Sequence, residues 1–282
     1  MEERSVEVVC SDGYSISTQL YDPRADMSRG GLILANALGV PQGFYRATAR
    51  YFSDLGFRVT TFDYRGTGAS LAGDPSTLRL EDWGLKDLDA VIARAQERDE
   101  KVFVMGHSVG GQLCPLAPRS RDLSGLVLVG ASFPLWSRWT FPRNLYMLFF
   151  WYGLLPALAL GRSHFPTRML GLSKEDMPVG FIRQWGKWAR RDGYVTSPDL
   201  GIDISGFEAF QAPVLSWGFD DDTYAPKANI QRLHQALPHS DIQLRFMAGR
   251  KIHGSGMGHF GFYRKARARK LWDETAQWLS GC

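Results

Sequence analysis

The sequence predicts an α/β fold with a mostly parallel central sheet and helices on both of its faces. Short apolar runs alternate with segments of helical periodicity along most of the chain. Most of these runs lack the apolar–polar alternation of a half-exposed strand, which is typical of strands buried on both faces. One run, 102–105, leads directly into Gly106-His107-Ser108-Val109-Gly110, a sequence typical of a tight turn between a strand and a helix.

The N-terminal part of the chain begins this pattern. Residues 6–10 and 15–21 are rich in β-forming side chains and flank a Ser-Asp-Gly turn signal, so they predict a hairpin. A fully apolar strand follows at 31–36. Residues 44–55 repeat apolar side chains at helical spacing, and Gly56 is placed to end that helix.

The next part of the chain continues the alternation. A strand is predicted at 57–62 and an amphipathic helix at 80–98. The 102–105 strand and its turn come next, and Pro115 should keep the helix after the turn short. The sixth strand is predicted at 126–130.

The alternation stops at Ser132. From there to about Ser205 the chain is rich in Trp, Phe and Tyr, prolines recur, and no strand pattern is visible. An insertion of this size after the sixth strand predicts a helical cap over the carboxyl edge of the sheet. We therefore expect a core of residues 1–131 and 206–282 and an aromatic-rich cap of residues 132–205.

The βα pattern resumes after the insertion. Strands are predicted at 213–217 and 242–246, with a helix at 226–237 between them. A glycine-rich loop, 248–258, and an amphipathic helix after 263 complete the chain.

Composition limits the classes of function. The 282 residues are 44% hydrophobic and 22% charged, with a formal net charge of +4. Three scattered cysteines predict a reducing compartment, and no secretory signal or stretch long enough to span a bilayer is visible. The basic run 264–270 is interpreted as a solvated helix face. We expect a cytoplasmic protein that acts on a small-molecule substrate, binds no nucleic acid and does not insert stably into a membrane. The sequence allows a homo-oligomer.

The spacing G-x-S-x-G has a steric cause. The turn holds Ser108 in a strained backbone conformation, and side chains at 106 or 110 would collide with the neighbouring strand or helix. The hydroxyl is then lifted clear of the sheet beside a helix N-terminus. A serine that only caps the helix is the alternative.

The sequence resembles the α/β-hydrolase superfamily over nearly its whole length apart from the cap. The resemblance rests on the GHSVG turn, the DYRGTGAS loop after the fourth strand, and the chain order Ser, Asp, His. The motifs ANALGVPQGFYR, GLSKEDMP, DDDTYAP and GHFGFYR are similar to a poorly characterised bacterial group of predicted α/β-hydrolases. In the DYRGTGAS loop, the resemblance implies a structural role, with Arg65 in an internal ion pair.

A serine nucleophile needs a base, and histidine suits this because its ordinary pKa is near neutrality. His107 lies inside the turn and should point away from the Ser108 hydroxyl. Two histidines, His253 and His259, follow the last predicted strand, where the base is expected. The resemblance favours His259, within the GHFGF pattern; His253 is the alternative base.

The acid is expected among three consecutive aspartates after the penultimate predicted strand. The spacing G-x-x-D common in this fold, counted from Gly218, indicates Asp221. Counting back from Pro226 as D-x-x-x-P indicates Asp222 instead. We predict Asp221, with Asp222 as the alternative acid; the other two carboxylates should face solvent or cap the next helix.

An oxyanion hole needs two backbone donors. The N–H of Val109 is the expected first donor, and the N–H of Ala37 or Leu38, in the loop after the third strand, the second. Histidines and cysteines are not clustered at metal-ligand spacing, and no phosphate loop or dinucleotide motif is present. We therefore expect no metal and no cofactor.

These features predict a serine hydrolase that cleaves a carboxylic ester, or a thioester or amide, of a small apolar substrate through an acyl-enzyme. Ser108 would be the nucleophile, His259 the base and Asp221 the acid. An aminopeptidase-like or acyl-transferring relative is an alternative, because one triad serves several acceptors. A non-catalytic binding protein on the same fold is an alternative from another class.

Overall fold

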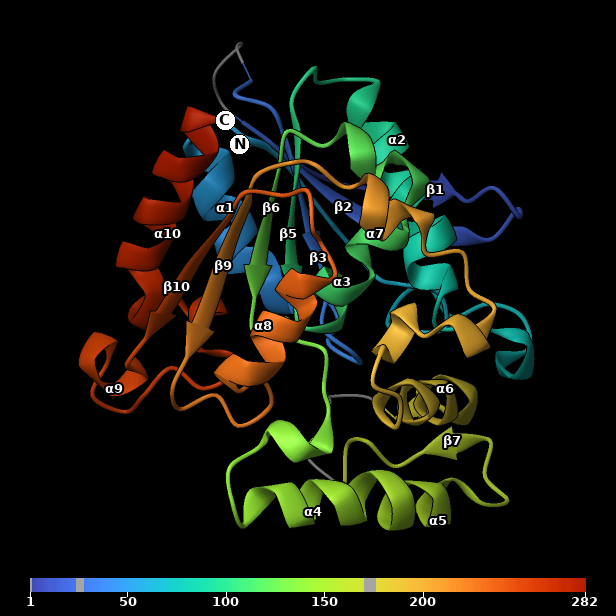
Figure 1. The fold of residues 1–282 in the computed structure, drawn as a ribbon. Helices are drawn as coiled ribbons and strands as arrows, with labels where there is room; N and C mark the ends of the chain where they lie inside the picture. The colour runs from blue at the N-terminus through green and yellow to red at the C-terminus, as the bar shows by residue number, and fades with distance from the viewer. Residues whose placement is uncertain (1, 24–27, 170–175) are drawn as a thin grey trace.

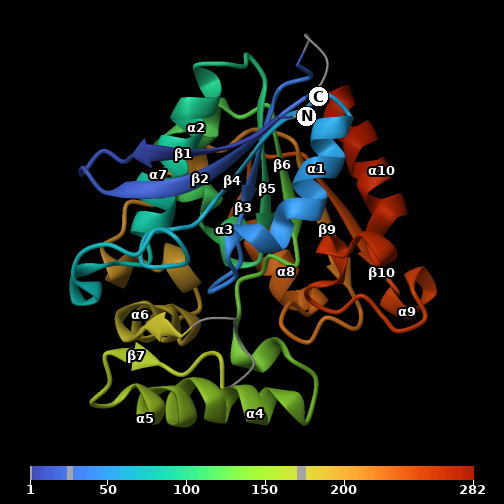
Figure 2. The same ribbon diagram turned by 180° about the vertical axis from the view of Figure 1, so that it is seen from behind.

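The computed structural model describes residues 2–23, 28–169 and 176–282. An eight-stranded sheet with the strand order β1-β2-β4-β3-β5-β6-β9-β10 runs through its centre (Figures 1 and 2). Most of the GLSKEDMP motif, 171–175, lies outside the described residues.

The sheet is mostly parallel, as predicted. β1 pairs antiparallel with β2, and β2 antiparallel with β4; every other neighbouring pair is parallel. The N-terminal hairpin is confirmed, although β1 is longer than expected. The strands are β1 Glu2–Val9, β2 Ser15–Asp22, β3 Gly31–Ala35, β4 Arg58–Phe62, β5 Val102–His107, β6 Gly125–Val129, β9 Val214–Phe219 and β10 Ile242–Met247.

Helices cover both faces of the sheet (Figures 1 and 2). α1 and α10 pack on one face around Phe52 and Trp272, whereas α2, α3 and α8 pack on the other around Ile92, Leu113 and Leu233. The core helices are α1 Arg46–Asp54, α2 Asp89–Gln96, α3 Val109–Leu113, α8 Lys227–Gln235, α9 Gly249–Ile252 and α10 Lys265–Gly281.

The predicted helix at 80–98 differs from the structure. A π-helical segment, Trp83–Leu88, precedes α2. A side chain at Gly84 would lie 2.4 Å from the carbonyl oxygen of Leu113, so this segment passes very close to the end of α3. Short 3₁₀ segments occur at Gln42–Tyr45, Pro75–Thr77, Cys114–Leu116, Pro118–Asp122, Trp136–Arg138, Tyr194–Thr196, Pro198–Leu200 and Gly261–Tyr263.

Arg65 lies in a buried ion-pair cluster, as expected for the loop after β4. Its guanidinium is 2.7 Å from Asp87 and 2.7 Å from Asp12. The side chains of Arg65 and Asp87 are 3% and 0% exposed. Removing Arg65 would leave the fully buried carboxylate of Asp87 without its ion-pair partner, which is strongly destabilising.

The segment 132–205 lies at the end of the molecule toward which β5, β6 and β9 point (Figure 1). Its described elements are α4 Arg143–Phe149, a π-helical turn Phe150–Leu154, α5 Leu155–Ala159, β7 His164–Phe165, β8 Met177–Pro178 and α6 Val179–Ala189, with α7 Ser205–Ala209 at its end. The β7–β8 pair was not predicted, because two-residue strands are too short to show alternation. No helix in the described ranges is long and apolar enough to cross a bilayer.

Candidate active site

Ser108 lies in the tight turn between β5 and α3, in the strained conformation that the motif predicts. Its φ is +52°, in a region that side-chain-bearing residues rarely adopt. A Cβ at Gly106 would lie 2.4 Å from the Cα of Gly111, and one at Gly110 would lie 2.4 Å from the carbonyl oxygen of Ala35. Both glycines are therefore required by close backbone packing.

The imidazole of His259 is held by Asp222. The Nδ1 of His259 lies 2.7 Å from Oδ2 of Asp222, and these side chains are only 7% and 1% exposed. The other oxygen, Oδ1, accepts hydrogen bonds from the backbone N–H groups of Tyr224 at 2.8 Å and Ala225 at 3.2 Å. Because both oxygens accept, the carboxylate is fixed and Nδ1 must carry the proton.

The prediction that Asp221 orients the imidazole is wrong in this structure. Its carboxylate instead accepts hydrogen bonds from the backbone N–H groups of Met257 at 2.8 Å and Gly258 at 3.1 Å. Asp221 therefore ties down the loop immediately before His259. The alternative acid, Asp222, is the aspartate that contacts the ring.

The surroundings of Asp221 explain why the spacing rule failed. A Cβ at Gly249 or at Gly256 would lie 2.1 Å from an Asp221 oxygen, so two glycines leave room for this carboxylate against the loop. Asp220 also binds this loop, accepting from the N–H of Gly249 at 2.8 Å. Asp220 is exposed, as expected for a remaining aspartate, whereas Asp222 is buried against His259 and does not face solvent.

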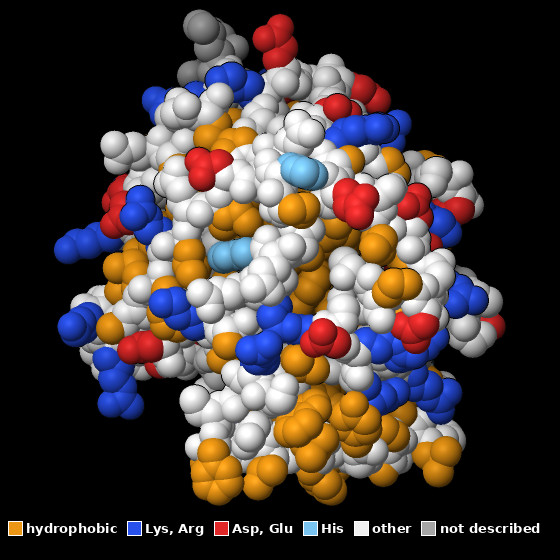
Figure 3. All heavy atoms as spheres, in the orientation of Figure 1, with side chains coloured by type: hydrophobic (Ala, Val, Ile, Leu, Met, Phe, Trp, Pro, Cys, Tyr) orange, Lys and Arg blue, Asp and Glu red, His pale blue; other side chains and the backbone are white. Residues whose placement is uncertain are grey.

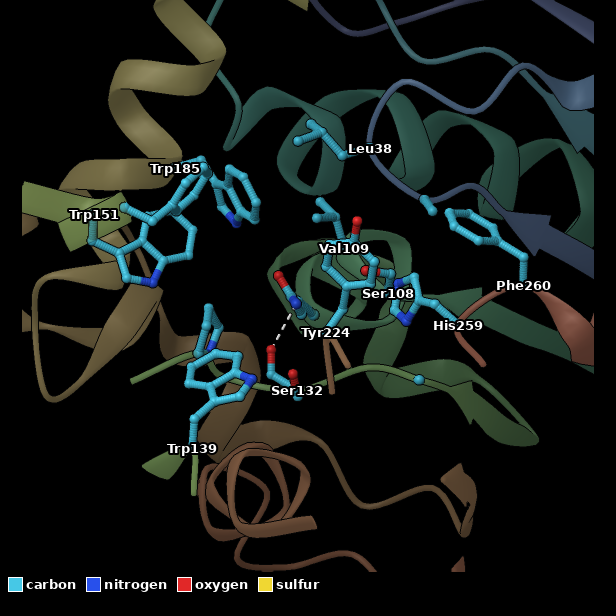
Figure 4. A pocket seen from close by; sticks show the side chains of 15 residues that line it. Leu38, Ser108, Val109, Ser132, Trp139, Trp151, Trp185, Tyr224, His259 and Phe260 are labelled. Carbon is cyan, nitrogen blue, oxygen red and sulfur yellow. Dashed lines mark hydrogen bonds between the residues drawn. The ribbon is translucent and has the colours of Figure 1, made fainter. Parts of the chain in front are cut away.

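Ser108 and His259 line one cavity (Figure 4). Within the described residues no hydrogen bond joins the serine hydroxyl to the imidazole; such bonds are often long before substrate binds. Gly130, with φ +57°, lies against the Asp–His pair: a Cβ there would be 3.1 Å from both the Asp222 carboxylate and the His259 ring.

His253, the alternative base, is directed elsewhere. Its Nδ1 lies 2.9 Å from the hydroxyl of the exposed Ser255, and it is not among the residues that line the cavity. Of the two histidines after β10, the structure brings only His259 to the cavity with Ser108.

Two N–H groups were predicted as candidates for the second oxyanion donor, and one of them already donates a hydrogen bond within the protein. The N–H of Ala37 donates to the hydroxyl of Tyr45 at 2.9 Å, so it cannot also bind an oxyanion. In the part of the chain that is described, the N–H of Leu38 has no hydrogen-bond partner. Leu38 and Val109 both line the cavity, and their N–H groups remain as the candidate donors.

A buried hydrogen-bond chain that the sequence did not reveal connects three parts of the site. The Tyr45 hydroxyl lies 2.9 Å from Nδ1 of His107, and Nε2 of His107 lies 3.0 Å from the carbonyl oxygen of His259. A carbonyl can only accept, so Nε2 carries the proton, and Nδ1 accepts from the tyrosine. The ring is thus directed away from the Ser108 hydroxyl, as expected. Burial and the nearby His259 ring lower the pKa of His107 far below its ordinary value, so this imidazole is neutral.

The cavity walls are largely aromatic (Figure 4). Trp139, Phe150, Trp151 and Trp185 come from the segment 132–205, whereas Tyr224 and Phe260 come from the core. Gln112 also lines the cavity, but its amide is engaged: it donates to the Ser132 carbonyl at 2.6 Å and accepts from Tyr194 at 2.8 Å. None of the described lining residues is Asp, Glu, Lys or Arg.

A metal centre finds no support in the donor set. Across the described ranges, no group of three His, Cys, Asp or Glu side chains is arranged to hold a metal ion.

Solved structures with the same fold include several esterases. The Pyrococcus furiosus esterase Pf2001 aligns at 14% identity over 99% of this chain and 91% of that one, with a TM-score of 0.61. The Exiguobacterium antarcticum esterase EaEST aligns at 16% identity over 98% and 99% of the two chains, with a TM-score of 0.63. The α/β hydrolase GrgF from Penicillium sp. sh18 gives 14% identity, 99% and 98% coverage, and a TM-score of 0.67. At these identities the likeness is one of fold.

The sequence itself matches one family model, described as serine aminopeptidase, S33, over residues 27–171. The match covers just over half of the chain and includes the strained turn at Ser108. No curated protein matches the sequence. The chain therefore belongs to the α/β-hydrolase superfamily, in the family described as serine aminopeptidase, S33.

Proposed function

We propose that this protein is a serine hydrolase that cleaves carboxylic esters through an acyl-enzyme, with Ser108, His259 and Asp222 as its triad. The observation that carries the proposal is the 2.7 Å contact between His259 and Asp222 at the cavity that also holds Ser108. Because Asp222 fixes the proton on Nδ1, the other ring nitrogen is left as a base for the serine hydroxyl.

The first half of the reaction transfers the acyl group to the enzyme. The Ser108 oxygen attacks the ester carbonyl as its proton passes to Nε2 of His259, and the carbonyl oxygen becomes an oxyanion. The N–H groups of Val109 and Leu38 stabilise this charge. The C–O bond to the alcohol then breaks, and the alcohol leaves with the proton from Nε2.

The second half restores the enzyme. Water loses a proton to Nε2 and attacks the acyl carbon, giving a second oxyanion at the same donors. When the bond to Ser108 breaks, the acid is released and the serine oxygen takes the proton back. Asp222 stays ionised throughout and stabilises the imidazolium formed in each half.

The cavity favours a small, uncharged, apolar substrate. The described residues that line it include four aromatic side chains from the segment 132–205 and no carboxylate. An aminopeptidase must accommodate the ammonium group of its substrate, and burying that charge without a carboxylate partner is costly. The lining therefore supports an ester over an aminoacyl amide as the substrate.

The test is labelling with a fluorophosphonate probe, followed by turnover of short p-nitrophenyl esters and of aminoacyl p-nitroanilides. We expect labelling and ester hydrolysis by the wild-type protein. Ser108→Ala should abolish labelling and lower turnover by several orders of magnitude while leaving the circular dichroism spectrum unchanged.

Each alternative gives a different outcome. Absence of Ser108-dependent labelling would support a non-catalytic binding protein. Labelling with turnover of the anilides but not of the esters would support an aminopeptidase. Acyl transfer to an added alcohol in preference to water would support an acyltransferase.

A further inference from the structure

The outer face of the α4–α5 helix pair exposes an unusual number of large apolar side chains. In the described residues, ten large apolar side chains are markedly exposed, and seven of them lie between 141 and 169. We call these seven the apolar face: Phe141, Leu145, Tyr146, Phe149, Tyr152, Leu160 and Met169. Figure 3 shows hydrophobic side chains gathered over α4 and α5, with Lys and Arg side chains along their margin.

The opposite side of the same helices is also apolar. Met147, Phe150, Trp151 and Leu155 are buried there, and two of them line the cavity beside Ser108. A helix on the surface of a soluble protein normally presents polar side chains to water. A contiguous exposed apolar face of this kind marks an interaction surface.

The segment that carries the apolar face is basic, although the exposed Asp176 accepts a hydrogen bond from the backbone N–H of Arg168 at one end of it. Between 132 and 169 the sequence contains four arginines and no Asp or Glu. Arg138 lies before α4 and Arg162 after the end of α5, and both are exposed, whereas Nε of Arg143, at the start of α4, is buried. Neither Arg138 nor Arg162 forms an ion pair with another described residue. Exposed arginines therefore precede α4 and follow α5.

We infer that the apolar face docks on an anionic lipid surface. A helix that lies in the membrane interface combines apolar and aromatic side chains, which enter the acyl boundary, with basic side chains that meet anionic headgroups. Tyr146 and Tyr152 suit the level of the headgroups, because the ring is apolar and the hydroxyl polar. A second copy of the chain is a poorer occupant, since a two-fold interface would bring like arginines together.

Docking would place the helices that line the cavity against the bilayer. The inference rests on the surface alone and does not depend on the proposed catalytic function.

The test is sedimentation of the full-length protein with vesicles of phosphatidylcholine, with and without phosphatidylglycerol. We expect binding to the mixed vesicles at least about tenfold tighter than to phosphatidylcholine alone, and weakened by salt, because each arginine near the surface adds to the attraction. Phe149→Ser with Leu160→Ser should abolish binding, and Arg138→Gln with Arg162→Gln should remove the preference for anionic vesicles.

Val9→Ser is the matched control, because Val9 is 65% exposed on β1, outside the apolar face. It should bind like the wild-type protein. Equal binding to both vesicle types, or no binding, would overturn the inference. The inference would also be overturned if the wild-type protein bound no vesicles and formed a dimer in sedimentation equilibrium, while the variant with Phe149→Ser and Leu160→Ser was a monomer. The apolar face would then join two copies of the chain. Circular dichroism checks that each variant folds. If a variant does not fold, the binding of the wild-type protein to the two vesicle types still tests the inference.

Discussion

The carboxylate of Asp222 accepts hydrogen bonds from two sets of donors at once. An asparagine at this position has only one oxygen, so it cannot accept from both sets. Oδ1 accepts from two backbone N–H groups, whereas Oδ2 accepts from Nδ1 of His259. An asparagine that keeps its oxygen on the backbone donors turns its NH₂ toward Nδ1. The proton of His259 must then move to Nε2, where it prevents the ring from accepting the serine proton.

The size of the loss in kcat depends on how often the asparagine amide adopts the opposite orientation. Turning the amide over would restore the correct tautomer, but it would place the NH₂ against the N–H groups of Tyr224 and Ala225. Losing two buried hydrogen bonds costs about 2–3 kcal/mol, so the productive orientation would be populated about one part in 10². Loss of the negative charge beside the imidazolium adds to this, and in other triads the same replacement lowers kcat by about 10⁴.

The assay compares Asp222→Asn with Asp221→Asn in p-nitrophenyl ester turnover. Asp222→Asn should lower kcat by about 10²–10⁴. Asp221→Asn keeps one acceptor for the loop N–H groups, so we expect a loss of about 1–3 kcal/mol in stability and less than about a tenfold loss in kcat. Rates of fluorophosphonate labelling give a second measure of serine reactivity that does not depend on the ester chosen.

Two results would refute this reasoning. One is Asp222→Asn retaining kcat within about tenfold of the wild type. The other is Asp221→Asn losing more activity than Asp222→Asn while its melting temperature stays unchanged. Either would mean that the observed contact is not the one that supports turnover.

Three further predictions concern positions around the triad and on α8. Tyr45→Phe leaves the N–H of Ala37 and Nδ1 of His107 without hydrogen-bond partners. Urea unfolding should show that the free energy of unfolding falls by about 2–4 kcal/mol, and kcat should fall by a larger factor than KM changes. Gly130→Ala places a methyl group 3.1 Å from both members of the Asp–His pair at a φ of +57°; kcat should fall about tenfold or more, and unchanged turnover would contradict the packing. Burial lowers the pKa of His234 from 6.5 to about 4, so between these values the unfolded chain binds more protons and stability falls as pH falls. Urea unfolding at about pH 7 and about pH 5 should show a loss of about 1–2 kcal/mol from this group, absent in His234→Gln; an equal loss in both proteins would contradict it.

The fold followed closely from the sequence. Strand positions in the core were predicted within a few residues because buried parallel strands are continuous apolar runs, and GHSVG was informative because sterics alone demand glycine on both sides of Ser108. The π-helical segment before α2 and the β7–β8 pair were missed, since neither has a periodic signal of its own.

The acid and the second oxyanion donor were not predictable in the same way. Asp221 and Asp222 are chemically identical neighbours, and which one meets His259 depends on the turn after β9 and on room left by glycines in a loop almost 30 residues away. The N–H of Ala37 is engaged because Tyr45 folds back onto it, a contact that spacing does not encode.

The sequence by itself determined which side chains could do chemistry and on which strand ends they would lie, because local sterics and hydrophobic periodicity act between near neighbours in the chain. Only the tertiary structure decided which carboxylate meets the imidazole, which of the two candidate N–H groups after β3 is engaged, and that large apolar side chains around α4 and α5 are exposed. Those outcomes depend on hydrogen bonds and packing between segments far apart in sequence, and a shift of one residue in a turn is enough to change them.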